Sequence, residues 1–97
     1  MATFIALIDF TDQGIRHIKD TPKRADAFVA AAKKLGVEVT EIYWTVGAHD
    51  GVLVFEAPDD QTATSLLVSL ASLGNVRTQS LRAFRRAEIE SILAKMP

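Results

Sequence analysis

One short segment in the middle of the chain holds two side chains that could do acid–base chemistry. In the segment GAHDG, His49 and Asp50 stand side by side between Gly47 and Gly51. An imidazole next to a carboxylate could serve as a general acid and base, or as a pair of ligand-binding groups. The same letters are typical of a turn, because Asp-Gly between two strand patterns is a strong hairpin signal and glycine accepts positive φ. We favour the hairpin, since neighbouring residues of a strand point to opposite faces and make a poor dyad.

Two isolated carboxylates add to the catalytic candidates. Asp9 and Glu56 each interrupt an apolar segment that we expect to be a central strand. A carboxyl group held in such a place is a candidate general base. Either side chain could line a cavity between sheet and helices, or simply reach solvent at the end of its strand. The candidate catalytic residues are therefore Asp9, His49, Asp50 and Glu56.

Aromatic and basic residues supply candidates for ligand binding. Tyr43 and Trp44 are adjacent in a strand pattern, so only one of them can face inward. We expect Trp44, which shares its face with Ile42, to lie in the core or at an interface. Arg82 belongs to a group of arginines around the last strand that could bind an anion or a carboxylate. Protection of an edge strand and solubility are the alternative. That group comprises Arg77, Arg82, Arg85 and Arg86.

The chain shows no motif for a metal or a cofactor. It has two histidines and no cysteine, and no spacing among its acidic residues resembles a metal site. The second histidine, His17, is close in sequence to Lys23 and Arg24, and we expect a solvated basic patch there rather than a ligand or base. A phosphate loop, a nucleophile elbow and a dinucleotide fingerprint are all absent. We predict no cofactor and no metal.

Composition narrows the classes of partner. The 97 residues suit a single domain spanning 1–97, and 11 basic against 12 acidic residues give no general case for binding nucleic acid or a membrane. The N-terminal apolar segment lacks a basic region before it and contains Asp9, so we predict neither a signal peptide nor an anchor. A cytoplasmic location is the default expectation.

Hydrophobic periodicity predicts the order βαββαβα. The helix that starts at the N-cap Thr21 and Pro22 and ends at Gly36, and the helix that follows the N-cap Asp59, are amphipathic. A shift in the alternation within 37–46 predicts a β-bulge in an edge strand. This order is the split βαβ of an α+β, ferredoxin-like fold. The predicted strands cover 3–10, 37–46, 52–57 and 76–84; a short helical turn covers 11–19 and a last helix covers 87–96.

The two central strands predict self-association. Both FIALI and VLVF are apolar at odd and even positions alike, so both faces of the sheet need cover. Two helices cover one face, and the last helix is too short to cover the other fully. A second copy packed face to face would do so, and we predict a homodimer or a higher even oligomer.

The chain resembles the GYD domain family over nearly its whole length. The similarity is carried by the stretches TFIALIDFTDQGIRHIKDTPKRADAF, EIYWTVGAHDGVLVFEAPDDQTA and LGNVRTQSLRAF. Members of this family of small bacterial and archaeal proteins carry a signature of Gly, one further residue, Tyr and Asp, which here falls on Gly47 to Asp50 with His49 in place of the tyrosine. The resemblance implies a dimeric α/β barrel, in which two ferredoxin-like chains pack sheet against sheet.

Three classes of function fit these expectations. The first is a homo-oligomeric module that binds a small apolar or aromatic molecule. The second is a cofactor-independent isomerase or monooxygenase, by analogy with other dimeric α/β barrels, in which Asp9, His49 or Glu56 would be the general base. The third is a structural or regulatory subunit that binds no ligand.

Overall fold

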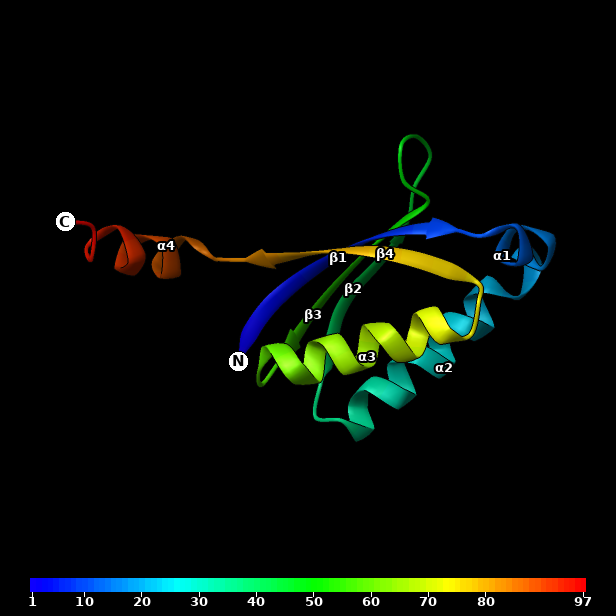
Figure 1. Cartoon of the computed structure of the whole chain (residues 1–97), viewed down its shortest axis with the longest axis horizontal. Helices are drawn as coiled ribbons and strands as arrows, with labels where there is room; N and C mark the ends of the chain where they lie inside the picture. The colour runs from blue at the N-terminus through cyan, green and yellow to red at the C-terminus, as the bar shows by residue number, and fades with distance from the viewer.

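The computed structural model describes all 97 residues, arranged as a four-stranded sheet with helices along one of its faces (Figure 1). The elements follow the predicted order, with one short 3-10 turn added before the first long helix. None of the helices is both long and apolar enough to span a bilayer. The elements are β1 (Ala2–Phe10), α1 (Asp12–Arg16), η1 (Ile18–Asp20), α2 (Thr21–Lys34), β2 (Glu38–Trp44), β3 (Gly51–Ala57), α3 (Asp60–Ser72), β4 (Val76–Ala83) and α4 (Arg86–Leu93).

The sheet has the topology expected for a ferredoxin-like α+β fold. Its strand order is β2-β3-β1-β4, and every neighbouring pair is antiparallel. The predicted central strands β1 and β3 are central, and the strand with a polar face, β4, lies at an edge. The register sets Phe4 opposite Phe55 on one face and Ile5 opposite Val54 on the other.

The predicted bulge lies in the other edge strand, β2. Val39 is paired with Phe55 and Glu41 with Val54, so Thr40 is the extra residue. Its hydroxyl donates a hydrogen bond to the carbonyl oxygen of Val54 at 3.1 Å. The bulge returns the apolar side of β2 to the helix-covered face.

The start of α2 differs from the prediction by one residue. Thr21 is the first helical residue rather than the N-cap, and Asp20 precedes it without a side-chain cap. The 3-10 turn η1 leads straight into the helix, so no extended residue is left to act as a cap. The Asp59 cap of α3 is confirmed, because its Oδ1 accepts a hydrogen bond from the Thr62 N–H at 2.7 Å.

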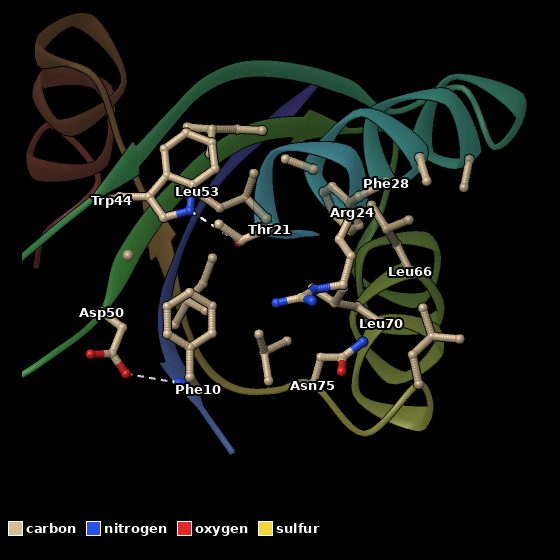
Figure 2. Close-up of a pocket in the computed structure, with 18 of the residues that line it drawn as sticks. Phe10, Thr21, Arg24, Phe28, Trp44, Asp50, Leu53, Leu66, Leu70 and Asn75 are labelled. Carbon is tan, nitrogen blue, oxygen red and sulfur yellow. Dashed lines mark hydrogen bonds between the residues drawn. The ribbon is translucent and has the colours of Figure 1, made fainter. Parts of the chain in front are cut away.

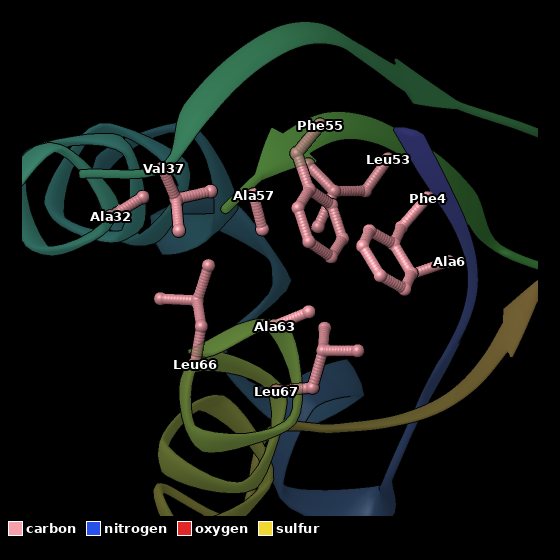
Figure 3. Close-up of a cluster of buried hydrophobic side chains, with 10 residues drawn as sticks. All are labelled: Phe4, Ala6, Ala32, Val37, Leu53, Phe55, Ala57, Ala63, Leu66 and Leu67. Atoms are coloured by element: carbon pink, nitrogen blue, oxygen red, sulfur yellow. The ribbon is translucent and has the colours of Figure 1, made fainter. Parts of the chain in front are cut away.

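The hydrophobic core lies between the sheet and helices α2 and α3 (Figure 3). The rings of Phe4 and Phe55 stack across β1 and β3 with centroids 5.4 Å apart. Leu66 and Leu67 reach them from α3, and Ala32 packs from α2. Burial alternates strictly along β3, so its odd-numbered residues are buried under the helices and its even-numbered ones are half-exposed.

The opposite face of the sheet has no cover, and we call it the open face. The last helix does not lie on it: α4 projects past the end of β4, away from the body (Figure 1), and the molecule measures 51 × 31 × 18 Å. The exposed apolar residues of α4 include Ile92 and Leu93, at 39% and 54%. The apolar side chains of the open face are Ile5, Leu7, Val52, Val54 and Leu81.

Candidate functional site

The segment GAHDG belongs to a hairpin, as predicted. Strands β2 and β3 pair up to Trp44 and Gly51, and residues 45–50 form the connecting loop, which rises on the side of the sheet away from α2 and α3 (Figure 1). The glycine with positive φ is Gly47, at 138°, and not Gly51. Glycine suits position 51 for another reason: a β-carbon there would make a tight contact, 3.0 Å from the carbonyl oxygen of Tyr43. Our conformational argument for the Asp-Gly pair was therefore wrong, although the hairpin itself is confirmed.

His49 finds its partner in β1 rather than in its neighbour Asp50. Its Nδ1 lies 3.1 Å and 3.3 Å from the two carboxylate oxygens of Asp9. The loop is held in this position by Thr45, whose hydroxyl donates to the carbonyl oxygen of His49 at 2.6 Å. The side chains of His49 and Asp9 are 31% and 40% exposed, so water screens the pair. No third histidine or carboxylate joins them in a group that could hold a metal ion.

Asp50 is tied to β1 by both its backbone and its side chain. Its N–H donates to the carbonyl oxygen of Ile8 at 2.8 Å, and its Oδ2 accepts from the N–H of Phe10 at 2.8 Å. These bonds fasten the base of the loop to the central strand. They place the carboxylate beside a cavity under the helices, whereas Asp9 belongs to the open face. His49 and Asp50 therefore lie in different surroundings: His49 pairs with Asp9 of the open face, and Asp50 borders the cavity.

Glu56 lies near the other end of β3, apart from the remaining catalytic candidates. Glu56 is five positions after Gly51, which corresponds to about 17 Å along a strand. Its Oε1 is 3.5 Å from Nη1 of Arg85, and the same guanidinium donates to the hydroxyl of Thr3 at 2.6 Å. The structure thus brings Asp9 and His49 together, places Asp50 beside them on the other face, and leaves Glu56 in a separate ion pair.

A cavity of about 500 Å³ opens between the sheet and helices α2 and α3, at the end of the sheet where β2 and β3 meet the loop (Figure 2). Most of its walls are apolar, and three aromatic side chains, Phe10, Phe28 and Trp44, contribute to them. Its volume falls in the range of pockets that hold small molecules. The remaining lining residues are Ile8, Thr21, Arg24, Ala25, Ala27, Ala31, Ile42, Tyr43, Asp50, Gly51, Leu53, Leu66, Ser69, Leu70, Leu73, Asn75 and Val76.

Two of the three candidate ligand-binding residues line this cavity. Trp44 is not part of the core, since 50% of it is exposed, and its Nε1 donates to the hydroxyl of Thr21 at 3.1 Å. That hydrogen bond replaces the capping role we expected of Thr21 and joins β2 to the start of α2. Tyr43 also borders the cavity, but it pairs with Val52 across β2 and β3, so its side chain belongs to the open face and only the ring of Trp44 lies on the cavity side.

Arg82 lies elsewhere. Its guanidinium carbon is 4.5 Å from the centroid of the Phe84 ring and 5.5 Å from that of Phe4, and its Nη1 donates to the carbonyl oxygen of Thr3 at 3.1 Å. It is not among the residues that line the cavity. These contacts hold the end of β4 against β1 through cation–π attraction and hydrogen bonding.

Arg24 lines the cavity, although the sequence did not lead us to expect it there. We expected it in a solvated patch, and His17 is indeed exposed there. Arg24 instead turns toward the apolar walls (Figure 2), where its Nη1 donates to the carbonyl oxygen of His17 at 2.8 Å. A signal for this was present: Arg24 precedes Phe28 by four residues, which puts the charge on the apolar side of the helix.

Comparisons with known proteins agree with the fold. The family model described as the GYD domain matches residues 4–93. A protein of Thermus thermophilus named glutamine synthetase and cystathionine beta-lyase binding protein is 34% identical over 90 residues, which cover 92% of this chain and 95% of that protein. The crystal structure of TTHA0845 from Thermus thermophilus is similar, with a TM-score of 0.57 at 28% identity, covering 88% of this chain and 95% of that one.

Proposed function

The chain belongs to the GYD domain family, and we propose that it is a module that binds a small apolar or aromatic molecule and acts as a homo-oligomer. The observation that carries this proposal is the cavity of about 500 Å³ between the sheet and the helices. Its walls combine aromatic rings with a few polar groups, which is the usual composition of a small-molecule site. A subunit without a ligand would be expected to fill this space with side chains.

The open face supports the homo-oligomer. Ile5, Leu7, Val52 and Val54 form a continuous half-exposed apolar strip on the two central strands. Packing two such faces together, as in a dimeric α/β barrel, would remove them from water. At roughly 25 cal/mol per Å², a few hundred Å² of apolar surface contributes several kcal/mol.

The positions of the four catalytic candidates favour the binding function over the enzymatic alternative. Of the four catalytic candidates, only Asp50 lines the cavity, and one of its oxygens already accepts a hydrogen bond from the Phe10 N–H. The pair formed by His49 and Asp9 belongs to the loop and the open face. An isomerase or monooxygenase would need its general base within reach of the bound substrate.

A matched pair of substitutions tests the binding proposal. Ala25→Leu places a larger side chain in the cavity, whereas Ala30→Leu makes the same change at an exposed position of α2 outside it. Isothermal titration with 2-naphthoate and 2-naphthamide should show binding of at least one compound to the wild type and to Ala30→Leu, and weaker binding to Ala25→Leu. A native mass spectrum of the purified protein should show even-numbered oligomers, with or without extra bound mass. No binding of either compound, together with a spectrum free of bound mass, would contradict the proposal.

A second candidate function is the binding of a partner enzyme. The Thermus relative is named for binding glutamine synthetase and cystathionine beta-lyase. In this chain α4 projects from the body with exposed apolar residues such as Ile92 and Leu93, which suits a docking helix. Sedimentation of the chain with purified glutamine synthetase should then show a complex that is lost in Ile92→Asp and kept in Val68→Asp, a change on the exposed side of α3. Independent sedimentation of the two wild-type proteins would argue against this candidate.

A further inference from the structure

Arg24 is the only cation that lines the cavity, and it forms no ion pair. Its guanidinium donates to the carbonyl oxygens of His17 at 2.8 Å and Gly14 at 3.4 Å. A guanidinium has five N–H groups in one rigid plane, so part of its donor capacity has no partner in the protein. The two carbonyl contacts hold the plane in position, which lowers the entropy lost when it binds an anion.

A second free hydrogen-bond donor, the side-chain amide of Asn75, lies at the same corner of the cavity as Arg24. The side-chain oxygen of Asn75 accepts a hydrogen bond from Nε2 of Gln13 at 2.9 Å, and its amide nitrogen has no hydrogen-bond acceptor within the protein. Gly14 links the two groups, because its carbonyl oxygen accepts from Arg24 while its α-carbon lies against the backbone of Asn75. This corner therefore offers hydrogen-bond donors and a positive charge.

The other side of the cavity carries a negative charge. Asp50 lies across from Arg24 (Figure 2), and its negative charge disfavours an anion there. The rings of Phe10 and Trp44 contribute apolar wall on the side of the sheet. A bound molecule would place an acidic group at Arg24 and an apolar body along the rings.

We infer that the cavity binds an apolar or aromatic carboxylate, with Arg24 as the residue that pairs with the acid group. The inference rests on the proposed function, since it names the ligand class of the same cavity. A planar carboxylate can accept two parallel hydrogen bonds from a guanidinium, and such pairs are stronger than bonds between neutral groups. Asn75 would donate a further bond to one carboxylate oxygen.

The test compares 2-naphthoate with 2-naphthamide by isothermal titration, because the two share a ring system and differ in charge. We expect the wild type to bind the carboxylate about tenfold more tightly or better. Arg24→Met should lose this preference and bind the amide as the wild type does, and Arg24→Lys should keep part of it. Lys23→Met, which removes the neighbouring exposed charge, should behave as the wild type.

The outcomes separate the inference from the proposed function. If the wild type binds both compounds equally, the inference is wrong and the binding function stands. If neither compound binds and the native mass spectrum shows no bound mass, both fail. A preference for the carboxylate that persists in Arg24→Met would overturn the assignment of Arg24. The preference for the carboxylate is first measured on the wild type alone. Equal binding of both compounds by the wild type therefore contradicts the inference even if Arg24→Met does not fold.

Discussion

Gly14 lies directly against the backbone carbonyl of Asn75, so that a β-carbon at residue 14 would overlap the oxygen. Gly14 is the only buried residue of α1, and its N–H donates to the hydroxyl of Thr11 at 3.1 Å. The N–H of Thr11 in turn donates to the Asn75 carbonyl oxygen at 3.1 Å. This contact joins the end of β1 to the start of β4 and sets the corner at which Arg24 enters the cavity.

Gly14→Ala should therefore destabilise the protein by about 1–3 kcal/mol, the usual cost of forcing extra volume into a packed site. The obstacle is a backbone atom, which cannot move aside as a flexible side chain can. Urea unfolding measures the change, and Arg16→Ala at an exposed position of α1 is the control. An unfolding midpoint equal to that of the wild type would mean that the contact is not tight in solution.

The adjacent residues His49 and Asp50 should respond differently to substitution. Asp50→Ala leaves the half-buried N–H of Phe10 without its acceptor, and we expect a loss of about 1–3 kcal/mol in the free energy of unfolding. Asp50→Asn retains an acceptor oxygen and should lose less. His49→Ala should cost no more than about 1 kcal/mol, because its pair with Asp9 is substantially exposed. Equal losses for His49→Ala and Asp50→Ala in urea unfolding would contradict this account of the loop.

The N-cap of α3 should make stability depend on pH in the acid range. The hydrogen bond from the Thr62 N–H favours the charged form of Asp59 and holds the pKa of that carboxyl below 3.8. Its contribution is therefore complete above pH 3.8 and is lost as the pH falls through the lower pKa of the folded state. Asp59→Asn keeps a neutral cap whose strength does not titrate.

Unfolding curves of the wild type and Asp59→Asn between pH 2 and pH 7 measure this effect. The stability advantage of the wild type over the variant should be constant near neutral pH and should shrink below pH 3.8. A difference that stays the same across the whole range would show that the charge on Asp59 does not contribute.

The open face should be the surface of self-association. Val54→Lys introduces a charge in the middle of this face, opposite Ile5, and should convert an even-numbered oligomer into a folded monomer. Val68→Lys makes the same change on the exposed side of α3 and should leave the oligomer intact. Light scattering after size-exclusion chromatography distinguishes the two. A wild-type protein that is monomeric at micromolar concentration would rule out the homo-oligomer.

Features that depend on local pattern could be predicted from the sequence. The bulge within 37–46, the Asp59 cap and the helical turn within 11–19 were all predicted from local residue patterns. The N-cap of α2 was predicted one residue too late, at Thr21. The 3-10 turn η1 runs directly into α2, so no extended residue marks the start of the helix.

The site residues were predicted less completely, because their roles depend on contacts between distant segments. Asp9 and His49 were both named as candidates, yet the sequence contains nothing that pairs two residues 40 positions apart. Arg24 was assigned to a basic surface, since its charged neighbours in sequence lie on it. Its spacing from Phe28 indicated the apolar side of the helix, whereas the carbonyl oxygens of Gly14 and His17 that hold its guanidinium come from a separate segment.

The sequence alone determined the order of the elements, the strands that are central, the hairpin and the apolar character of both faces of the sheet. These follow from periodicity, caps and turn residues, which act over a few neighbouring residues. The tertiary structure decided which face the helices cover, where the cavity lies, and which charged side chains reach it. Such features arise from packing between segments that are far apart in the chain, and side-chain types constrain that packing without specifying its contacts.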